Sequence, residues 1–235
     1  MSPWLERRSR LDRLAAAIML VLSAPIIGAA ALATWLQDHG PVFVRIDRVG
    51  RRRRPLLMLK IRSMRADGAA GVARGSTISA GRDPRITPVG AVLRRFRVDE
   101  LPQLVHVVNG SMALLGPRPE APAFVTADKR WDDVLEALPG IAGPTQLVFA
   151  ELETTLPADD TAGFYARHVL PGKLDVDRWY VAHATPLVDL RIALGLVQLL
   201  VLRRSPTILT ELVEREIPDL RARLHSAGVA AGAAP

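Results

Sequence analysis

The sequence has no cysteine among its 235 residues. This excludes disulfide bonds, thiolate metal sites and cysteine nucleophiles, and it is compatible with a reducing compartment. Aromatic residues are also scarce, at 5%. The chain has no recognisable nucleic-acid-binding motif and no aromatic side chains interleaved among basic ones, which disfavours a nucleic-acid-binding protein.

Lysine is nearly absent as well, because 28 of the 31 basic residues are arginine. The formal net charge is +7. Such a balance favours polyanionic partners: nucleic acid, anionic lipid headgroups or phosphorylated substrates. Arginine in particular gives planar, bidentate contacts to phosphate.

Charge of either sign is missing over 23 consecutive residues, Leu14–Leu36. A run of this length is enough to span a bilayer, which needs about 20 residues. Arginines flank both ends, and the positive-inside rule would keep both ends on the cytoplasmic side. Pro25 removes a helix hydrogen bond, and Ser23 is placed to satisfy a freed backbone group.

These features favour a re-entrant membrane helix, a helix-break-helix with its membrane bend at Ser23 and Pro25. A true span, a signal peptide and a buried soluble helix remain as alternatives. The length allows one domain with an appended membrane segment. We expect an α+β, mainly helical fold, divided into a basic N-terminus and membrane helix (1–40), a small catalytic domain at the membrane interface (41–204), and an amphipathic helix with a disordered tail (205–235).

Hydrophobic periodicity and turn residues predict the remaining elements. Residues 41–62 alternate as a β-hairpin, whose turn carries Arg51–Arg54, a patch suited to anionic headgroups. Residues 66–81 predict a mobile loop. Helices are expected over residues 89–96, 101–108, 121–138, 165–180, 187–202 and 207–224, with the helix 165–180 interrupted at Pro171 and Gly172 and with residues 226–235 disordered.

Two adjacent carboxylates, Asp99 and Glu100, follow a cluster of arginines and precede the predicted helix 101–108. Pro102 suits the first turn of a helix. One interpretation is structural: Asp99 caps the helix and Glu100 is a first-turn acid. The other is a reactive carboxylate beside a metal-binding carboxylate, with arginines such as Arg94 holding a phosphate.

Further cations extend this second interpretation. Lys60 and Arg62 end the return strand of the hairpin, where they suggest a basic pocket or, alternatively, a solvated strand end. Arg85 follows in a predicted turn at Asp83–Arg85. Arg118 stands between two prolines, which hold it in an extended segment suited to an anion or to an ordinary turn.

Taken together, these motifs resemble the bacterial sugar transferase family, the monotopic phosphoglycosyl transferases. The resemblance runs from about Arg10 to Leu202. Its order and spacing are specific, although each motif alone is weak. The matching segments are Gly40–Phe43, Arg48–Gly50, Lys60–Met64, Asp83–Thr87, Asp99–Leu104, Gly116–Glu120, Pro139–Ile141 and Val188–Ile192.

The resemblance implies that Asp99 is the nucleophile and that Glu100 helps to hold Mg²⁺, with Asp99 as a second metal-binding carboxylate. Lys60, Arg94 and Arg118 would contact phosphates, and we assign Arg62 and Arg85 to the same role. The implied reaction transfers a sugar 1-phosphate from a nucleotide diphosphosugar, such as a UDP-sugar, to polyprenyl phosphate at the cytoplasmic membrane. A homodimer is left open, and no nucleic-acid partner is expected.

The chain also departs from the family pattern. Leu138 stands where the family usually has an arginine, and residues 142–150 lack the usual Gly-Arg. This loop is implicated in donor recognition, so the sugar and nucleotide stay open. A membrane-tethered, non-catalytic relative that binds a sugar nucleotide or a partner enzyme is the main alternative to an enzyme.

Overall fold

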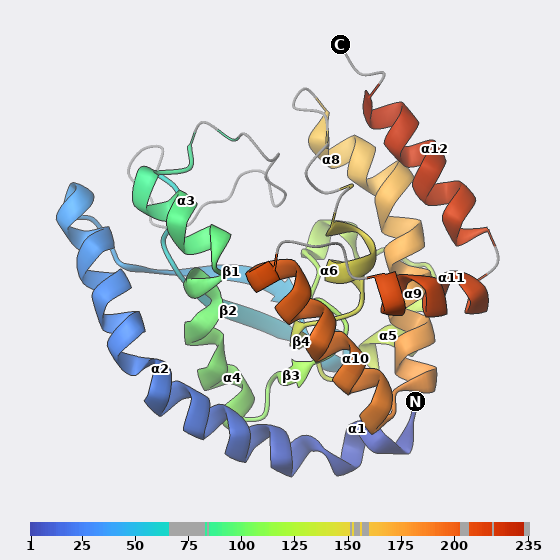
Figure 1. Cartoon of the computed structure of the whole chain (residues 1–235), viewed down its shortest axis with the longest axis horizontal. Coiled ribbons are helices and arrows are strands. Elements are labelled where there is room, and N and C mark those ends of the chain that lie inside the picture. Colours follow the sequence, from blue (N-terminus) through green and yellow to red (C-terminus); the bar gives the residue numbers. More distant parts are fainter. Residues whose placement is uncertain are drawn as a thin grey trace.

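The computed structural model describes residues 1–65, 83, 85–150, 152, 156, 160–202, 207–217 and 219–232. Figure 1 shows one long N-terminal helix curving around a mainly helical body that contains a β-hairpin. The predicted mainly helical α+β class is confirmed. The predicted loop at residues 66–81 lies outside the described part of the chain.

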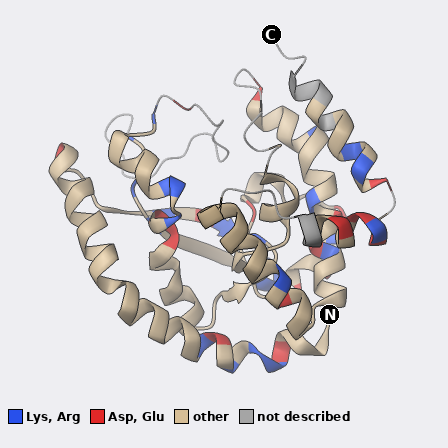
Figure 2. Ribbon diagram, viewed as in Figure 1, with Lys and Arg blue, Asp and Glu red and all other residues tan. Residues whose placement is uncertain are grey.

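The N-terminus forms α1 (Pro3–Arg7) and α2 (Ser9–Asp38). Among the described residues, α2 is the one helix long and apolar enough to cross a bilayer. Figure 2 shows that its charged residues lie near its two ends, and its middle carries none. The helix ends at His39, whose left-handed backbone (φ 52°) stops the helical progression.

The helix-break-helix expected at Ser23 and Pro25 is not seen, because α2 continues through Pro25 as one curved helix. Proline at this position removes the hydrogen bond to the carbonyl of Val21. The hydroxyl of Ser23 instead donates to the carbonyl of Leu20, at 3.3 Å. Ser23 therefore does not satisfy the group that Pro25 frees, and the helix bends gradually.

Only a narrow stripe of α2 packs on the body of the protein. Its four buried positions carry small residues at intervals of seven, seven and four, which places them on one face: Ala16, Ser23, Ala30 and Thr34. Small side chains let α4 and η2 approach the helix closely. The opposite face presents large apolar side chains, such as Val21 and Leu22, each 73% exposed.

The predicted hairpin is confirmed as β1 (Phe43–Val49) paired antiparallel with β2 (Pro55–Ile61). Side chains alternate between the two faces of a strand. The register therefore places Arg48, Met58 and Lys60 on one face.

The turn of the hairpin, η1 (Arg51–Arg53), contacts α5 through its arginines, and the predicted role of Arg51–Arg54 at headgroups stays a prediction. Arg51 donates to the carbonyl of Glu136 at 2.6 Å, and Arg53 lies 2.9 Å from the carboxylate of Asp132. Both acceptors belong to α5 (Arg130–Leu135) or its C-terminal end. These arginines therefore brace the hairpin against α5.

The centre of the chain forms α3 (Pro88–Arg95), η2 (Val98–Gln103) and α4 (Leu104–Val108). The predicted helix over residues 101–108 thus begins as a tighter 3₁₀ turn. Gly90 lets α3 lie directly against the segment that follows β2, because a Cβ there would stand 1.9 Å from the carbonyl oxygen of Ser63. This close approach fixes α3, and hence η2, beside the hairpin.

Two short strands, β3 (Ala113–Leu115) and β4 (Gly140–Ala142), pair in parallel, and no sequence pattern predicted this pairing. The helix expected over residues 121–138 is largely absent: only η3 (Pro122–Phe124) and α5 form there. Asp128 explains part of the difference, since its carboxylate accepts from the backbone N–H of Arg130 and forms a local turn.

The C-terminal half supplies most of the core. Its elements are α6 (Thr145–Val148), α8 (Thr161–Phe164), the π-helix η4 (Tyr165–Val169), α9 (Leu170–His183), α10 (Pro186–Val197), the π-helix η5 (Gln198–Leu202), α11 (Thr207–Glu216) and α12 (Leu220–Gly232). Residues 187–202 are helical as predicted. The largest apolar cluster gathers fully buried side chains such as Tyr180 and Ile192 from this half.

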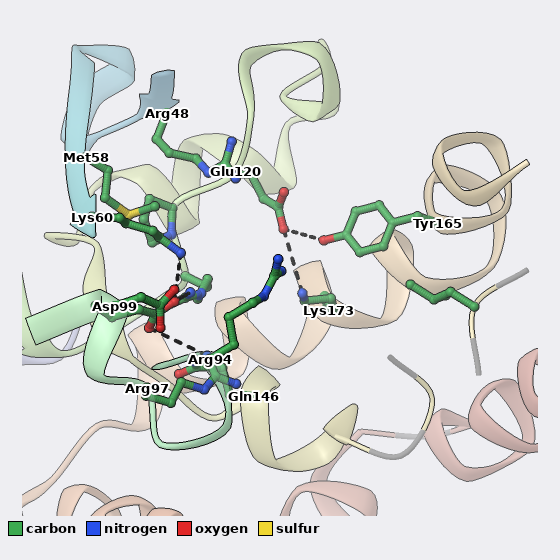
Figure 3. Close-up of a pocket in the computed structure, with 14 residues that line it drawn as sticks. Arg48, Met58, Lys60, Arg94, Arg97, Asp99, Glu120, Gln146, Tyr165 and Lys173 are labelled. Atoms are coloured by element: carbon green, nitrogen blue, oxygen red, sulfur yellow. Dashed lines mark hydrogen bonds and ion pairs between the residues drawn. The ribbon is translucent and has the colours of Figure 1, made fainter. Parts of the chain in front are cut away.

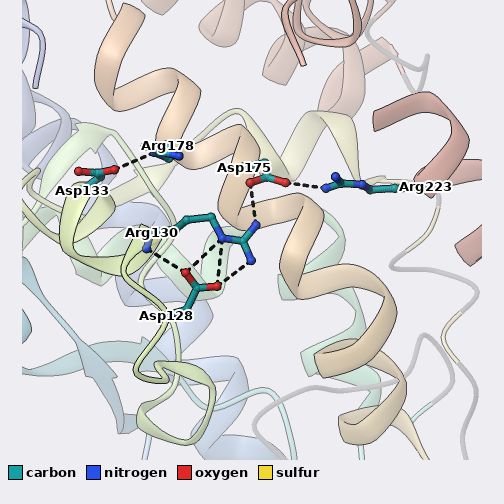
Figure 4. Close-up of polar contacts among 6 residues, drawn as sticks. All are labelled: Asp128, Arg130, Asp133, Asp175, Arg178 and Arg223. Atoms are coloured by element: carbon teal, nitrogen blue, oxygen red, sulfur yellow. Dashed lines mark hydrogen bonds and ion pairs between the residues drawn. The ribbon is translucent and has the colours of Figure 1, made fainter. Parts of the chain in front are cut away.

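A chain of ion pairs fixes α12 to α9 and α5 (Figure 4). Asp175 accepts from Arg130 at 2.8 Å and from Arg223 at 2.6 Å. The expectation of a disordered tail from residue 226 was wrong for most of its length, since α12 runs to Gly232. The expected helix 207–224 is also two helices.

Candidate active site

A cavity of about 320 Å³ lies between the hairpin, η2 and the C-terminal helices. Three carboxylates line it: Asp99, Glu100 and Glu120. Six cations outnumber them: Arg48, Lys60, Arg94, Arg97, Arg118 and Lys173. The excess of positive charge suits a ligand with several negative charges, such as a diphosphate.

Glu100 is the most tightly held of these carboxylates. Its side chain accepts from Lys60 at 2.8 Å and is bidentate with Arg118, while Arg97 lies 3.6 Å away. Burial alone would raise the pKa of Glu100, but Arg118 and Lys60 outweigh it and hold that pKa well below its usual range. Glu100 therefore stays ionised and organises the cations around it.

Asp99 differs from its neighbour although both are buried. Within the described part of the chain, no hydrogen bond reaches the Asp99 carboxylate, whereas both Glu100 oxygens are engaged. Burial raises the pKa of Asp99, and Lys60 opposes that rise only in part. Arg94 also lowers the pKa of Asp99, but desolvation has the larger effect.

The backbone before these carboxylates is strained. Arg97 adopts a left-handed conformation (φ 55°), which costs energy for a residue with a Cβ. The turn separates α3 from η2 and lets Arg94 and Arg97 line the same cavity as Asp99. Such strain persists where the surrounding structure determines the conformation.

Arg118 is placed as the flanking prolines suggested. Its guanidinium bridges Glu100 and the carbonyl of Ile141, the latter at 2.6 Å. The two-strand pairing of β3 and β4 brings Ile141 beside the segment that carries Arg118. The contact therefore links the carboxylate pair to the Pro-Gly-Ile loop.

The opposite side of the cavity is built from residues far along the chain (Figure 3). Tyr165 donates its hydroxyl hydrogen bond to Glu120, and Lys173 lies 3.8 Å from the same carboxylate. The ammonium of Lys173 also stands 5.1 Å from the centre of the Tyr165 ring. Burial lowers the pKa of Arg48 on this side, and Glu120 opposes that effect.

Of the residues selected from the sequence, five line the cavity together: Lys60, Arg94, Asp99, Glu100 and Arg118. Arg62 and Arg85 do not line it. Arg62 follows the last residue of β2 and turns to Asp38 at the end of α2, with a 2.6 Å contact. Arg85 pairs with Asp83 at 2.7 Å.

Sequence reasoning missed Arg97 and Gln146 near the carboxylate pair, and Glu120, Tyr165 and Lys173 opposite it. A signal existed for Arg97, since it belongs to the arginine cluster before Asp99. Tyr165 and Lys173 reach the cavity because η4 and α9 pack beside it, and no local sequence pattern predicts that packing. Gln146 lies in the segment that departs from the family pattern.

The sequence profile of the bacterial sugar transferase family matches residues 5–203. The chain belongs to this family. The UDP-glucose:undecaprenyl-phosphate glucose-1-phosphate transferase of Caulobacter vibrioides is 39% identical over 149 residues, which cover 60% of this chain and 53% of that protein. The exopolysaccharide production protein PSS of Rhizobium leguminosarum is 32% identical over 187 residues, 76% of this chain and 86% of that protein.

The chain therefore spans about half the length of the Caulobacter relative and nearly all of the Rhizobium one. The resemblance inferred from the sequence motifs is confirmed at the level of the family. In the sugar transferase fold seen here, the motif residues Lys60, Asp99, Glu100 and Arg118 converge on one cavity. Their individual roles stay predictions.

Proposed function

We propose that this sugar transferase moves a sugar 1-phosphate from a nucleotide diphosphosugar, a UDP-sugar, to a polyprenyl phosphate, and so primes glycan assembly. The observation that carries the proposal is the contrast between two adjacent buried carboxylates. Glu100 is fixed by cations, while Asp99 faces the same cation-rich cavity without a hydrogen bond from the described residues. The name of the Caulobacter relative describes such a transfer from UDP-glucose to undecaprenyl phosphate, and the name of the Rhizobium relative refers to exopolysaccharide production.

The reaction has two displacements. In the first, an oxygen of ionised Asp99 attacks the phosphorus nearest the sugar, and the bond from that phosphorus to the bridging oxygen breaks. Nucleoside monophosphate leaves with the bonding electron pair. In the second, an oxygen of the lipid phosphate attacks the same phosphorus, the bond to Asp99 breaks, and lipid diphosphosugar forms.

The cavity's own residues supply charge stabilisation for both steps. Lys60, Arg94 and Arg97 lie around Asp99 and lower the energy of negative charge that develops on the transferred group. Arg48, Arg118 and Lys173 are placed for the diphosphate of the donor. Arg94, Arg118 and Lys60 thus keep the phosphate-binding role proposed from the sequence.

Asp99, whose carboxylate accepts no hydrogen bond from the described residues, and Glu100, which is paired with Lys60 and Arg118, are the carboxylates that would hold Mg²⁺. Two carboxylates are an adequate protein contribution, because Mg²⁺ usually takes one or two carboxylates together with phosphate oxygens and water. No group of three or more His, Asp or Glu side chains is placed to hold a metal within the described ranges. When bound, Mg²⁺ would neutralise charge on the diphosphate.

The membrane arrangement follows from how α2 is tied down at its ends. At its start, buried Arg8 pairs with Asp189 and donates to Tyr180 at 2.7 Å; at its end, Asp38 pairs with Arg62. A helix of 30 residues is about 45 Å long, more than the roughly 30 Å bilayer core. Since both ends hold the same domain, we propose that α2 enters the cytoplasmic membrane from one side without crossing it.

A nucleophile replacement tests the proposed reaction. Asp99→Asn in membranes should reduce nucleoside monophosphate release by at least about a hundredfold, because the amide is not a nucleophile. The control is Asp47→Asn, an exposed aspartate outside the cavity, which should keep the wild-type rate. Wild-type turnover by Asp99→Asn would reject Asp99 as the nucleophile.

A further inference from the structure

A second cavity, of about 590 Å³, adjoins the active-site cavity. It lies between the N-terminal half of α2, η2 and α10, and we name it the α2–α10 groove. Fourteen of its twenty lining residues are apolar. Figure 1 shows α10 and the first turns of α2 at the same edge of the molecule.

The two cavities share three lining residues: Arg97, Glu100 and Gln146. The α2–α10 groove therefore opens beside the carboxylate pair, at the wall opposite Tyr165 and Lys173. The polar cavity and the apolar groove adjoin at these three residues. The two differ sharply in chemistry, which suits a ligand with an anionic head and a hydrocarbon chain.

The other polar side chains in the groove are already paired with each other. Arg8 binds Asp189, and Asp12 lies 3.5 Å from Arg8. The indole of Trp4 also donates to Asp189, at 2.6 Å. Arg8 Nε and Asp12 Oδ2 form no hydrogen bond with the described residues, but these groups lie in ion-pair contact with one another. The shared wall carries the other two charged side chains of the groove, Arg97 and Glu100, which lie 3.6 Å apart.

The mouth of the groove is made of exposed apolar side chains. Leu11 is 61% exposed, Phe96 55% and Leu190 53%. Large exposed apolar groups of this kind mark a surface that meets another molecule or a membrane. Leu11 continues the apolar outer face of α2, so the groove opens toward the lipid that α2 would contact.

From these observations we infer that the α2–α10 groove binds the first isoprene units of the lipid phosphate acceptor, with the acceptor phosphate at Arg97. This inference rests on the proposed function and adds the route by which the acceptor reaches the active site. The acceptor reaches Asp99 from the apolar side, while the nucleotide sugar occupies the polar side near Tyr165 and Lys173. A hydrocarbon chain ending in a phosphate matches an apolar groove whose wall toward the polar cavity carries Arg97.

Blocking the groove should separate the two half-reactions. Ala193 lines the groove on α10 and is exposed, so Ala193→Trp fills space without disturbing the core. Leu194→Trp is the matched control, because Leu194 is exposed on the same helix outside the groove. Leu11→Trp and its control Leu14→Trp repeat the test from the α2 wall.

We would measure nucleoside monophosphate release from a UDP-sugar without acceptor, and then the KM for undecaprenyl phosphate. The groove variants should release monophosphate like wild type but raise the KM for undecaprenyl phosphate by about tenfold, the effect of losing roughly two buried methylenes. The control variants should match wild type in both measurements.

Two results would overturn the inference. An unchanged KM in Ala193→Trp and Leu11→Trp would mean that the groove holds a bulk phospholipid chain or nothing that matters to the acceptor. An equal slowing of the acceptor-free release would place the donor there instead. A wild type that releases no monophosphate contradicts the proposed function itself, and the inference falls with it.

Discussion

At the scale of single residues, the site depends on two neighbouring carboxylates whose pKa values move in opposite directions. Glu100 is surrounded by partners that hold it ionised, and Asp99 is buried with fewer contacts. Paired titratable groups driven apart in this way are typical of acid–base and nucleophilic sites. The division of roles between them follows from their environments, since their sequence positions are adjacent.

Removing Lys60 should change the pH dependence of the first half-reaction. Lys60 lowers the pKa of Asp99 against the rise that burial causes, and Asp99 must be ionised to attack. In Lys60→Met the pKa of Asp99 therefore rises further, and monophosphate release falls off at a higher pH on the acidic side than in wild type. The pH profile of acceptor-free release measures this shift.

Lys129→Met serves as the control, because Lys129 is exposed and outside the cavity. Its acidic limb should coincide with that of wild type. A Lys60→Met profile that coincides as well would show that Lys60 does not act on Asp99.

The sequence predicted those residues of the site that belong to short local motifs. Lys60, Arg94, Asp99, Glu100 and Arg118 all stand in short motifs with turn or proline signals. Tyr165 and Lys173 escaped because their approach depends on how η4 and α9 pack. Arg62 was wrongly assigned to the phosphate-binding residues for a related reason. Its ion-pair partner Asp38 lies on α2, and the sequence did not predict where the end of that helix lies relative to the hairpin.

At the scale of elements, close packing determines the features of the fold that hydrophobic patterns and turn residues do not predict. The hairpin and the α3 and α10 helices follow from alternation, periodicity and proline positions. The break predicted at Pro25 did not form, because one missing hydrogen bond is tolerated in a long apolar helix. The β3–β4 pairing has strands of three residues each, too short for a recognisable alternation.

Gly90 provides a test of this packing. Gly90→Ala should destabilise the protein by about 1–3 kcal/mol, because the new Cβ would overlap the backbone of Ser63 and push α3 from the hairpin. Gly28→Ala is the control, since a Cβ at Gly28 meets nothing within 4 Å. Denaturant unfolding in detergent should show a lower free energy of unfolding for Gly90→Ala alone. Equal stabilities of the two variants would mean that α3 is not held against the hairpin as described.

At the scale of the whole molecule, one domain holds both ends of the apolar helix. The division into segments 1–40, 41–204 and 205–235 stays a prediction. Contacts at Arg8 and Asp38 join the first segment to the second. The apolar outer face of α2 and the mouth of the α2–α10 groove lie together. Under the proposed topology, this arrangement would let the protein take a lipid substrate without crossing the bilayer.

The absence of cysteine makes this topology easy to test. Single cysteines placed by Glu6→Cys and His39→Cys are exposed and flank α2. In sealed inverted membrane vesicles, a membrane-impermeant maleimide should label both, because both ends stay on the cytoplasmic side. Labelling of one site alone would identify a helix that crosses the membrane.

The central claim is that Asp99 carries the sugar phosphate between the two substrates. Its most direct measurement is the mass of the protein after incubation with a UDP-sugar in the absence of acceptor, followed by mapping of the modified peptide. We predict a phosphosugar adduct on Asp99 that disappears when undecaprenyl phosphate is added. Monophosphate release without any adduct, or an adduct that persists in Asp99→Asn, would contradict it.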